Sequence, residues 1–149
     1  MKAMEISLTG LDVEWRRLEV IAQNLANVNT LGTATSGPYR AMRLVSGPKT
    51  TFATNTFESH LAPDVAGSPD GSGLNGVAVY GIEPVGGTPR RVREPGNPLA
   101  DADGYVTYPD VDHAAEMVLM VKTTRAYEAN MVAMSSAREM YMKALDMGR

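Results

Sequence analysis

Both ends of the chain carry apolar residues at alternating steps of three and four, the spacing of coiled-coil helices. The first stripe predicts a helix from near Met4 to Ala26 or Asn27 with one apolar face. Its members are Met4, Leu8, Leu11, Trp15, Leu18, Ala22 and Leu25. The second stripe predicts a helix that begins after Pro109, with Asp110 or Asp112 as its N-cap, and ends at Gly148. Its members are Met117, Met120, Thr124, Tyr127, Met131, Met134, Arg138, Tyr141 and Leu145.

The two helices differ in length and in the width of their apolar faces. At 1.5 Å per residue the later helix is roughly 52 Å long and the earlier one roughly 36 Å, so the earlier helix cannot cover all of it. Small and methionine residues form a second row on the later helix: Ala126, Asn130, Ala133, Ala137, Met140, Ala144 and Met147. Methionine adapts its shape to different neighbours. We therefore expect the helices to pair within one subunit and to bind neighbouring subunits as well.

The residues expected to make these contacts lie on the two stripes. They are Leu8, Leu11, Trp15, Leu18, Leu25, Met117, Met120, Tyr127, Met131, Met134, Tyr141 and Leu145.

The middle of the chain is divided by turn residues, since all nine prolines and twelve of the fourteen glycines lie between Leu31 and Asp110. Short runs of apolar and β-branched residues predict strands at 39–45, 50–56, 77–82, 91–93 and 104–109. The predicted class is α+β, with a discontinuous coiled-coil-like domain at 1–29 and 110–149. A small β-rich segment at 30–109, with long loops and a modest core that leans on its neighbours for stability, is expected to separate the two halves.

Composition excludes several classes of protein. The net charge is −3 and no region is strongly basic, so neither nucleic acid nor an anionic membrane is an expected partner. Cysteine is absent, which rules out disulfides, a thiolate nucleophile and cysteine-ligated metal. The first ten residues lack the apolar run of a cleaved signal peptide, and no stretch is apolar enough to span a membrane.

One motif matches a nucleotide-binding fingerprint by spacing alone. Gly71-Ser72-Gly73-Leu74-Asn75-Gly76 has the form G-x-G-x-x-G. That fingerprint requires a preceding strand and a following helix, whereas here a Pro-Asp loop precedes it and a strand pattern follows. An exposed loop at 62–76 is the favoured interpretation. A small soluble ligand-binding or enzymatic domain that uses Gly71–Gly76 is the alternative hypothesis.

Other candidate chemistry is weak. Asp101-Ala102-Asp103-Gly104 begins like a calcium loop but lacks the later glutamate, which favours a turn before Tyr105. His60 and His113 each lack a second histidine at ligand spacing. Arg90, Arg91 and Arg93 alternate with nearby acids and indicate a contact surface. No catalytic residue, cofactor or metal is expected.

The end of the first helix carries the residues that identify a family. Asn24-Leu25-Ala26-Asn27-Val28-Asn29-Thr30 is similar to the N-terminal signature of bacterial flagellar axial proteins, with Asn24, Asn27, Asn29 and Thr30 as its polar positions. Segments of the C-terminal half resemble the proximal rod members of that family. They are Glu94-Pro95-Gly96-Asn97-Pro98, Gly104 to Val111, Glu116-Met117, Arg125 to Asn130 and Ala144 to Gly148.

The resemblance implies a structural subunit of the flagellar basal-body rod. Such a subunit would polymerise with itself and with other rod proteins around the export channel, in the cell envelope. It would be delivered by the flagellar export apparatus without a cleaved signal peptide. The terminal helices would form the inner coiled-coil domain, and the middle segment would project outward.

Overall fold

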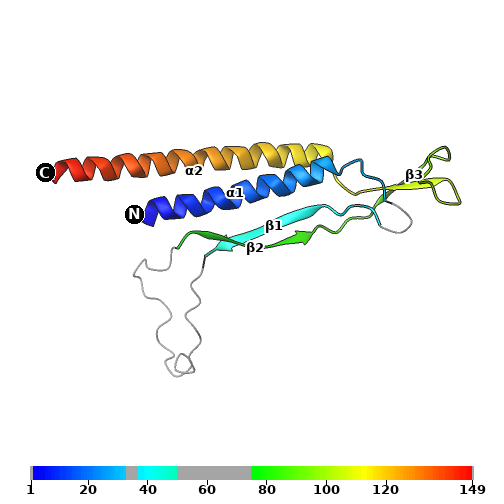
Figure 1. Ribbon diagram of the computed structural model, residues 1–149, viewed down its shortest axis with the longest axis horizontal. Helices are drawn as coiled ribbons and strands as arrows, with labels where there is room; N and C mark the ends of the chain where they lie inside the picture. Colours follow the sequence, from blue (N-terminus) through cyan, green and yellow to red (C-terminus); the bar gives the residue numbers. More distant parts are fainter. Residues whose placement is uncertain (1, 33–36, 50–74, 149) are drawn as a thin grey trace, which may run out of the picture.

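The computed structural model describes residues 2–32, 37–49 and 75–148. The described residues form two long helices and two antiparallel two-stranded sheets. In chain order they are α1 (Lys2–Ala26), β1 (Met42–Pro48), β2 (Val77–Pro84), β3 (Arg90–Arg93), β4 (Tyr105–Tyr108) and α2 (His113–Met147). This architecture confirms the predicted α+β class with terminal helices and a β insert (Figure 1).

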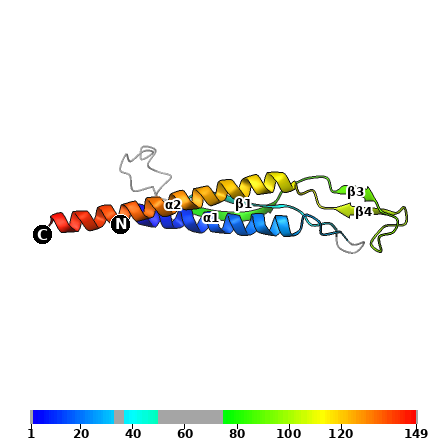
Figure 2. The same ribbon diagram turned by 90° about the horizontal axis from the view of Figure 1, so that it is seen from above.

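The two helices lie side by side and run in opposite directions, so the start of α1 and the end of α2 lie at the same end of the subunit (Figure 1). The β1–β2 hairpin lies along α1, on the side away from α2 (Figure 1). The β3–β4 hairpin extends beyond the opposite end of the helices (Figure 2). The subunit is therefore elongated, with α1 between α2 and the first hairpin.

Local signals explain where the helices begin and end. Asp112 is the N-cap of α2, and its Oδ1 accepts hydrogen bonds from the backbone N–H groups of Ala114 and Ala115 at 2.9 and 3.2 Å. These bonds satisfy donors that have no partner inside the helix, so Asp112 rather than Asp110 fixes the start. The helix ends at Gly148, as predicted.

The observed strands agree with some of the predicted strands better than with others. β2, β3 and β4 confirm three predicted strands, with small differences at their ends. The first predicted strand, at 39–45, is displaced, because β1 begins at Met42 and continues to Pro48. Tyr39 precedes the strand and donates from its hydroxyl to Asn24 in α1, while Pro48, which lacks an N–H group, is tolerated at the strand end. The predicted strand at 50–56 lies outside the described residues.

The core is small and belongs mainly to the helices. Val13, Val20 and Ile21 of α1 are buried, together with Ala41 just before β1 and Val106 in β4. Among the described residues, the middle segment contributes Ala41 and Val106 to this core and packs against the helices. Two-stranded sheets are marginal alone, and the β1–β2 hairpin gains its burial by packing on α1.

A close backbone approach fixes the hairpin to α1. Thr9 Oγ1 accepts a hydrogen bond from the backbone N–H of Val77 at 3.1 Å and itself donates to the carbonyl of Ile6. The preceding residue, Gly76, has φ +94°, and a Cβ placed there would lie 2.2 Å from Thr9 Oγ1. Glycine is required at this position by both conformation and space. Only Asn75 and Gly76 of the Gly71–Gly76 motif belong to the described residues.

Candidate assembly interface

Part of the predicted N-terminal stripe does not face the core. The exposed fractions of Leu8 and Trp15 are 59% and 56%, whereas Val13 and Val20 are 3% exposed. At 100° per residue, Val13 and Val20 lie about 140° around the helix from Leu8 and Trp15. The prediction of a single apolar face on α1 is therefore wrong, since one face is buried in the subunit and another is left at the surface.

Other members of the N-terminal stripe lie between these two faces. Leu11, Leu18 and Leu25 are half-buried, and Ala22 is exposed. Val13 and Val20 are seven residues apart, and this second heptad spacing is the feature of the sequence that indicates the buried face.

On α2 the face that meets α1 is rotated slightly from the predicted stripe. Met120, Tyr127 and Met134 are half-buried, and so are Asn130 and Ala137. Met117, Met131, Tyr141 and Leu145 are exposed. An α-helix has 3.6 residues per turn, so a strict seven-residue stripe drifts around a straight helix and only some of its members reach a given partner.

The helices approach closely where small residues allow it. A Cβ placed on Gly10 would lie 3.1 Å from the side chain of Asn130, so glycine permits the close packing of the two helices here. Nearby, the rings of Trp15 and Tyr127 lie 6.4 Å apart between centroids, tilted by 50°. Offset aromatic pairs of this kind contribute about 0.5–1.5 kcal/mol beyond the area that they bury.

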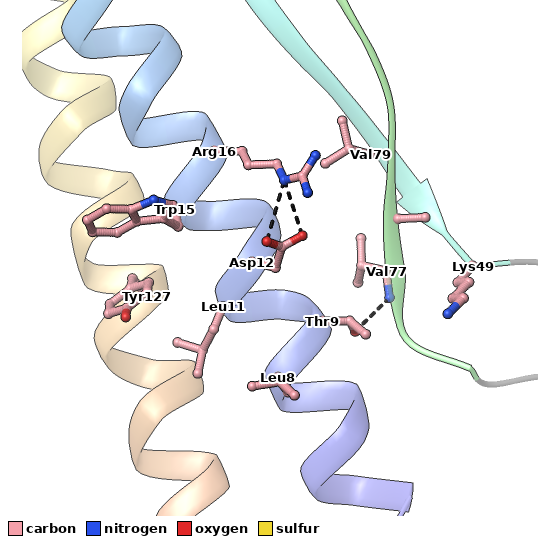
Figure 3. A pocket seen from close by; sticks show the side chains of 11 residues that line it. Leu8, Thr9, Leu11, Asp12, Trp15, Arg16, Lys49, Val77, Val79 and Tyr127 are labelled. Atoms are coloured by element: carbon pink, nitrogen blue, oxygen red, sulfur yellow. Dashed lines mark hydrogen bonds and ion pairs between the residues drawn. The ribbon is translucent and has the colours of Figure 1, made fainter.

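An open groove of 760 Å³ runs over the exposed face of α1 (Figure 3). Leu8, Leu11 and Trp15 form its floor from α1, Tyr127 borders it from α2, and Val77 and Val79 border it from β2. Asp12 and Arg16 form an exposed ion pair on the β2 side, with Arg16 Nε 3.3 Å from Asp12 Oδ2. The groove is thus an apolar strip with charged side chains on its β2 side, and α1, α2 and β2, which are far apart in the sequence, all contribute to it.

The end of α2 extends past the start of α1. Gly10 lies against Asn130 and Asn24 bonds Glu116, so fourteen residues along α1 correspond to fourteen residues back along α2. At that rate Lys2 lies level with about residue 138, and about nine residues of α2 extend beyond it. We call this segment, residues 139–147, the overhang; Figure 1 shows it in red.

A buried polar network joins both helices to β1. Asn24 is fully buried, and its Nδ2 donates to the Met42 carbonyl at 2.9 Å and to Glu116 Oε2 at 3.2 Å. Its Oδ1 accepts from the Met42 N–H and the Tyr39 hydroxyl, each at 2.9 Å. Glu116, only 2% exposed, also forms an ion pair with Arg43 of β1. Asn24, predicted only as a turn residue, is thus the centre of this network.

The rest of the signature segment forms the turn that ends α1. Asn27 Nδ2 donates to the Gln23 carbonyl at 2.8 Å, and the Thr30 hydroxyl donates to Asn27 Oδ1 at 3.1 Å. The backbone N–H of Thr30 also donates to the Asn27 carbonyl at 3.1 Å. Asn29 is exposed and points to no partner among the described residues. Asn27 and Thr30 therefore close the helix, while Asn24 holds it to the other elements.

The network predicts a loss of stability at alkaline pH. Burial, and after it the nearby Glu116 carboxylate, raises the pKa of Tyr39 above its ordinary value of 10.0. A raised pKa in the folded state means that this stabilisation is complete below the unfolded pKa and is lost as the pH rises through the folded one. Tyr39→Phe should therefore flatten the decline in unfolding free energy between about pH 9 and pH 11. Urea titrations at several pH values measure this, with Tyr141→Phe, an exposed position, as the control; equal declines in wild type and Tyr39→Phe would contradict it.

The β3–β4 hairpin holds its charges in local pairs. Arg91 bonds Asp101, and its guanidinium lies 4.9 Å from the ring centroid of Tyr105; that of Arg90 lies 5.3 Å from the Tyr108 centroid. The Tyr108 hydroxyl donates to Glu94 at 3.0 Å, and this bond is the main reason that the pKa of Tyr108 is raised. Of the three arginines in this cluster, Arg91 thus forms an ion pair, while Arg90 stacks on an aromatic ring and keeps its charge.

Asp101 forms the turn that the sequence predicts before Tyr105. Its Oδ1 accepts from the N–H groups of Tyr105 and Asp103, at 2.8 and 3.1 Å. Chiefly through the Tyr105 bond, these contacts lower the pKa of the Asp101 carboxyl.

The part of the chain that the structure describes assembles no cluster of side chains suited to a metal ion. No group of three or more histidine, aspartate or glutamate side chains converges there as metal ligands. His113 is exposed at the start of α2, and His60 lies outside the described residues. Neither described helix is both long and apolar enough to cross a bilayer.

Known proteins align with this chain over nearly its whole length. Residues 102–147, which include β4 and α2, match the family described as flagellar basal body rod FlgEFG protein C-terminal. The chain is 33% identical over 149 residues to the flagellar basal-body rod protein FlgC of Salmonella typhimurium, covering 100% of this chain and 98% of that protein. It is 36% identical over 151 residues to the FlgC protein of Bacillus subtilis, covering 99% and 97%. The Borreliella burgdorferi FlgC protein is 33% identical over 148 residues, covering 96% and 93%.

The matches extend over both terminal helices and the hairpins between them, in one continuous alignment of nearly full length. The chain therefore belongs to the FlgC family of flagellar basal-body rod proteins and is a structural subunit of the rod.

Proposed function

We propose that this chain polymerises as a noncatalytic subunit of the proximal rod, in contact with further copies of itself and with other rod proteins. The observation that carries this proposal is the amount of apolar surface left on the helices. Leu8 and Trp15 of α1 are exposed, and so are Met117, Met131 and Leu145 of α2. Exposed apolar patches of this kind mark interaction sites. Each methionine that a neighbour buries fully contributes about 1.5–3 kcal/mol, so repeated contacts would hold a polymer together.

The arrangement of the elements supports an inner and an outer side. In the proposal, residues 1–29 and 110–149 form the inner coiled-coil domain around the export channel, and residues 30–109 lie outside it. The β1–β2 hairpin covers α1 on the side away from α2, and the β3–β4 hairpin lies beyond the helix ends (Figure 2). This placement is compatible with helices innermost and with hairpins at larger radius.

Delivery is part of the same proposal. The subunit would pass through the flagellar export apparatus without a cleaved signal peptide and would take its place in the envelope-spanning rod. Its thin core supports this, because a subunit that buries few residues is marginally stable alone and can be unfolded for export at low cost. The alternative, a ligand-binding domain built on Gly71–Gly76, gains no support, since β2 rather than a helix follows the motif.

Deletion of this chain in the bacterium that carries it tests the proposed function. The deletion strain should lose swimming and contain no complete rods, because a structural subunit of the rod has no substitute. A plasmid copy should restore both. Electron microscopy of purified basal bodies and swimming in soft agar are the measurements. A deletion strain that swims normally would overturn the proposal. If Gly73→Ala leaves swimming and rod assembly unchanged, the ligand-binding alternative is left without support.

A further inference from the structure

We propose that the overhang of α2 in one copy packs into the groove over Leu8 and Trp15 of a second copy. This inference rests on the proposed function and deepens it, because it names one of the contacts that would hold the polymer together. It commits to one occupant of the groove, a second copy of this chain.

The overhang needs a partner that its own subunit does not supply. Met140, Tyr141, Met142, Leu145 and Met147 are all exposed, with Leu145 at 51%. At 100° per residue they are spread over more than half of the helix circumference, with Glu139, Lys143 and Asp146 on the remainder. A helix that is apolar around most of its surface is normally buried. The overhang is therefore built to be enclosed by neighbouring protein.

The overhang also continues an interface that already exists. Tyr127, Met134 and Ala137 face α1 within the subunit, and Tyr141 and Ala144 follow them on the same side of α2. They are exposed and lie beyond Lys2, the first described residue of α1. The side of α2 that is adapted to an α1 helix thus extends beyond the described part of α1 in the same subunit, which favours α1 of another copy as its partner.

The groove matches the overhang in length and chemistry. Leu8 and Trp15 are seven residues apart, about 10.5 Å along the helix, and Tyr141 and Leu145, which share the side of α2 that continues toward α1, span about 6 Å beside them. The floor is apolar and Tyr127 offers an aromatic edge, to which methionine sulfur is favourably drawn. Ala144 lets the helix backbones approach closely.

Charge at the edges agrees with this pairing. Glu5 and Glu19 are exposed on α1, seven residues to either side of Asp12, and form no ion pair among the described residues. Arg138 lies on the same side of α2 as Leu145 and is likewise unpaired in the described part of the subunit. Arg138 beside the overhang would therefore have Glu5 or Glu19 beside the groove as an acidic partner.

The geometry of the contact is head-to-tail, since it joins different surfaces of the two copies. Contacts of this type generate open helical assemblies when the rotation between copies does not close. Within one subunit the same surfaces cannot meet, because Leu8 lies level with about residue 132, roughly 20 Å along α2 from Leu145.

Disulfide trapping in assembled rods tests the inference. The chain contains no cysteine, so single replacements introduce the only thiols. Cells that lack the native copy would express two plasmid copies, one with Leu8→Cys and the other with Leu145→Cys, and basal bodies would be purified and oxidised. The control pair is Leu8→Cys with Val118→Cys, an exposed position on α2 outside the overhang. A disulfide requires Cα atoms within about 4–7 Å, so only docked positions should react readily.

The expected result is a Leu8–Leu145 cross-link formed at least about tenfold faster than the control, because docking holds the thiols at millimolar effective concentration. Mass spectrometry of the linked peptides identifies the pair. Assembled rods without this cross-link, or with equal rates for both pairs, would overturn the inference while leaving the proposed function intact. Failure of the unmodified plasmid copy to restore rods would instead overturn both.

Discussion

Asn24→Leu should lower the free energy of unfolding by about 3–5 kcal/mol, the largest loss expected from any single replacement outside the hydrophobic core. Leucine has a similar volume but can neither donate nor accept. The Met42 N–H would lose its acceptor and one oxygen of the buried Glu116 carboxylate would lose its donor, while the Met42 carbonyl would keep only its 3.3 Å bond from Arg43. Each buried polar group left without a partner costs about 1–3 kcal/mol. Thermal and urea unfolding followed by circular dichroism measure the change.

A matched control separates this effect from the loss of an asparagine at the end of α1. Asn29→Leu, five residues later and exposed, should change stability by no more than about 0.5 kcal/mol. Hydrogen exchange at the Met42 amide should accelerate in the Asn24 variant alone, because that N–H loses its acceptor. A stability change below about 1 kcal/mol for Asn24→Leu would show that the network does not hold the three elements together.

Met131→Asp should abolish rod assembly without unfolding the subunit. Met134→Asp should abolish assembly and also destabilise the subunit. The two methionines are three residues apart on α2, but Met131 is 45% exposed while Met134 is half-buried against α1. An exposed aspartate at 131 changes the subunit's stability by no more than about 0.5 kcal/mol, yet it places a charge where a neighbour's apolar surface must pack. At 134 the charge would lie in the half-buried contact with α1, at an expected cost of about 2–4 kcal/mol.

Thermal unfolding of the purified variants and electron microscopy of basal bodies measure the two effects separately. Secretion of the Met131→Asp chain should remain near the wild-type level, since the change acts after export. Met131→Leu is the control, because it keeps an apolar side chain of similar volume and should support swimming. Normal motility of the Met131→Asp strain would show that this side of α2 is not an assembly surface.

The sequence predicts the helices of this protein well, because each is long, strongly periodic and bounded by clear signals such as Asp112 and Gly148. It predicts which faces are buried less well. The stripe through Leu8 and Trp15 is as regular as a core stripe, yet it is exposed, while Val13 and Val20 on another face form the core. A helix that contacts both its own subunit and its neighbours carries apolar residues on several faces, and periodicity alone does not assign each face to a partner.

The sequence pattern also does not predict the buried polar network, because its members are far apart in the sequence. Asn24 and Glu116 are 92 residues apart, and each reads locally as an ordinary helix-terminal residue. Their burial follows from the antiparallel pairing of α1 and α2 together with the position of β1, which depends on how Tyr39 and Met42 approach the helix. Asn27 and Thr30, by contrast, bond within their own turn, and the sequence predicts that turn correctly.

The antiparallel helices have a practical consequence for handling this protein. The start of α1 and the end of α2 lie at the same end of the subunit (Figure 1). A purification tag or fluorescent protein fused at either position would therefore lie at the same end of the subunit. Exchanging one fusion site for the other would not relieve an assembly defect. The tip of the β3–β4 hairpin, between Arg93 and Tyr105, lies at the opposite end (Figure 2). An epitope inserted near the exposed Gly96 would label the subunit while leaving both helix ends unaltered.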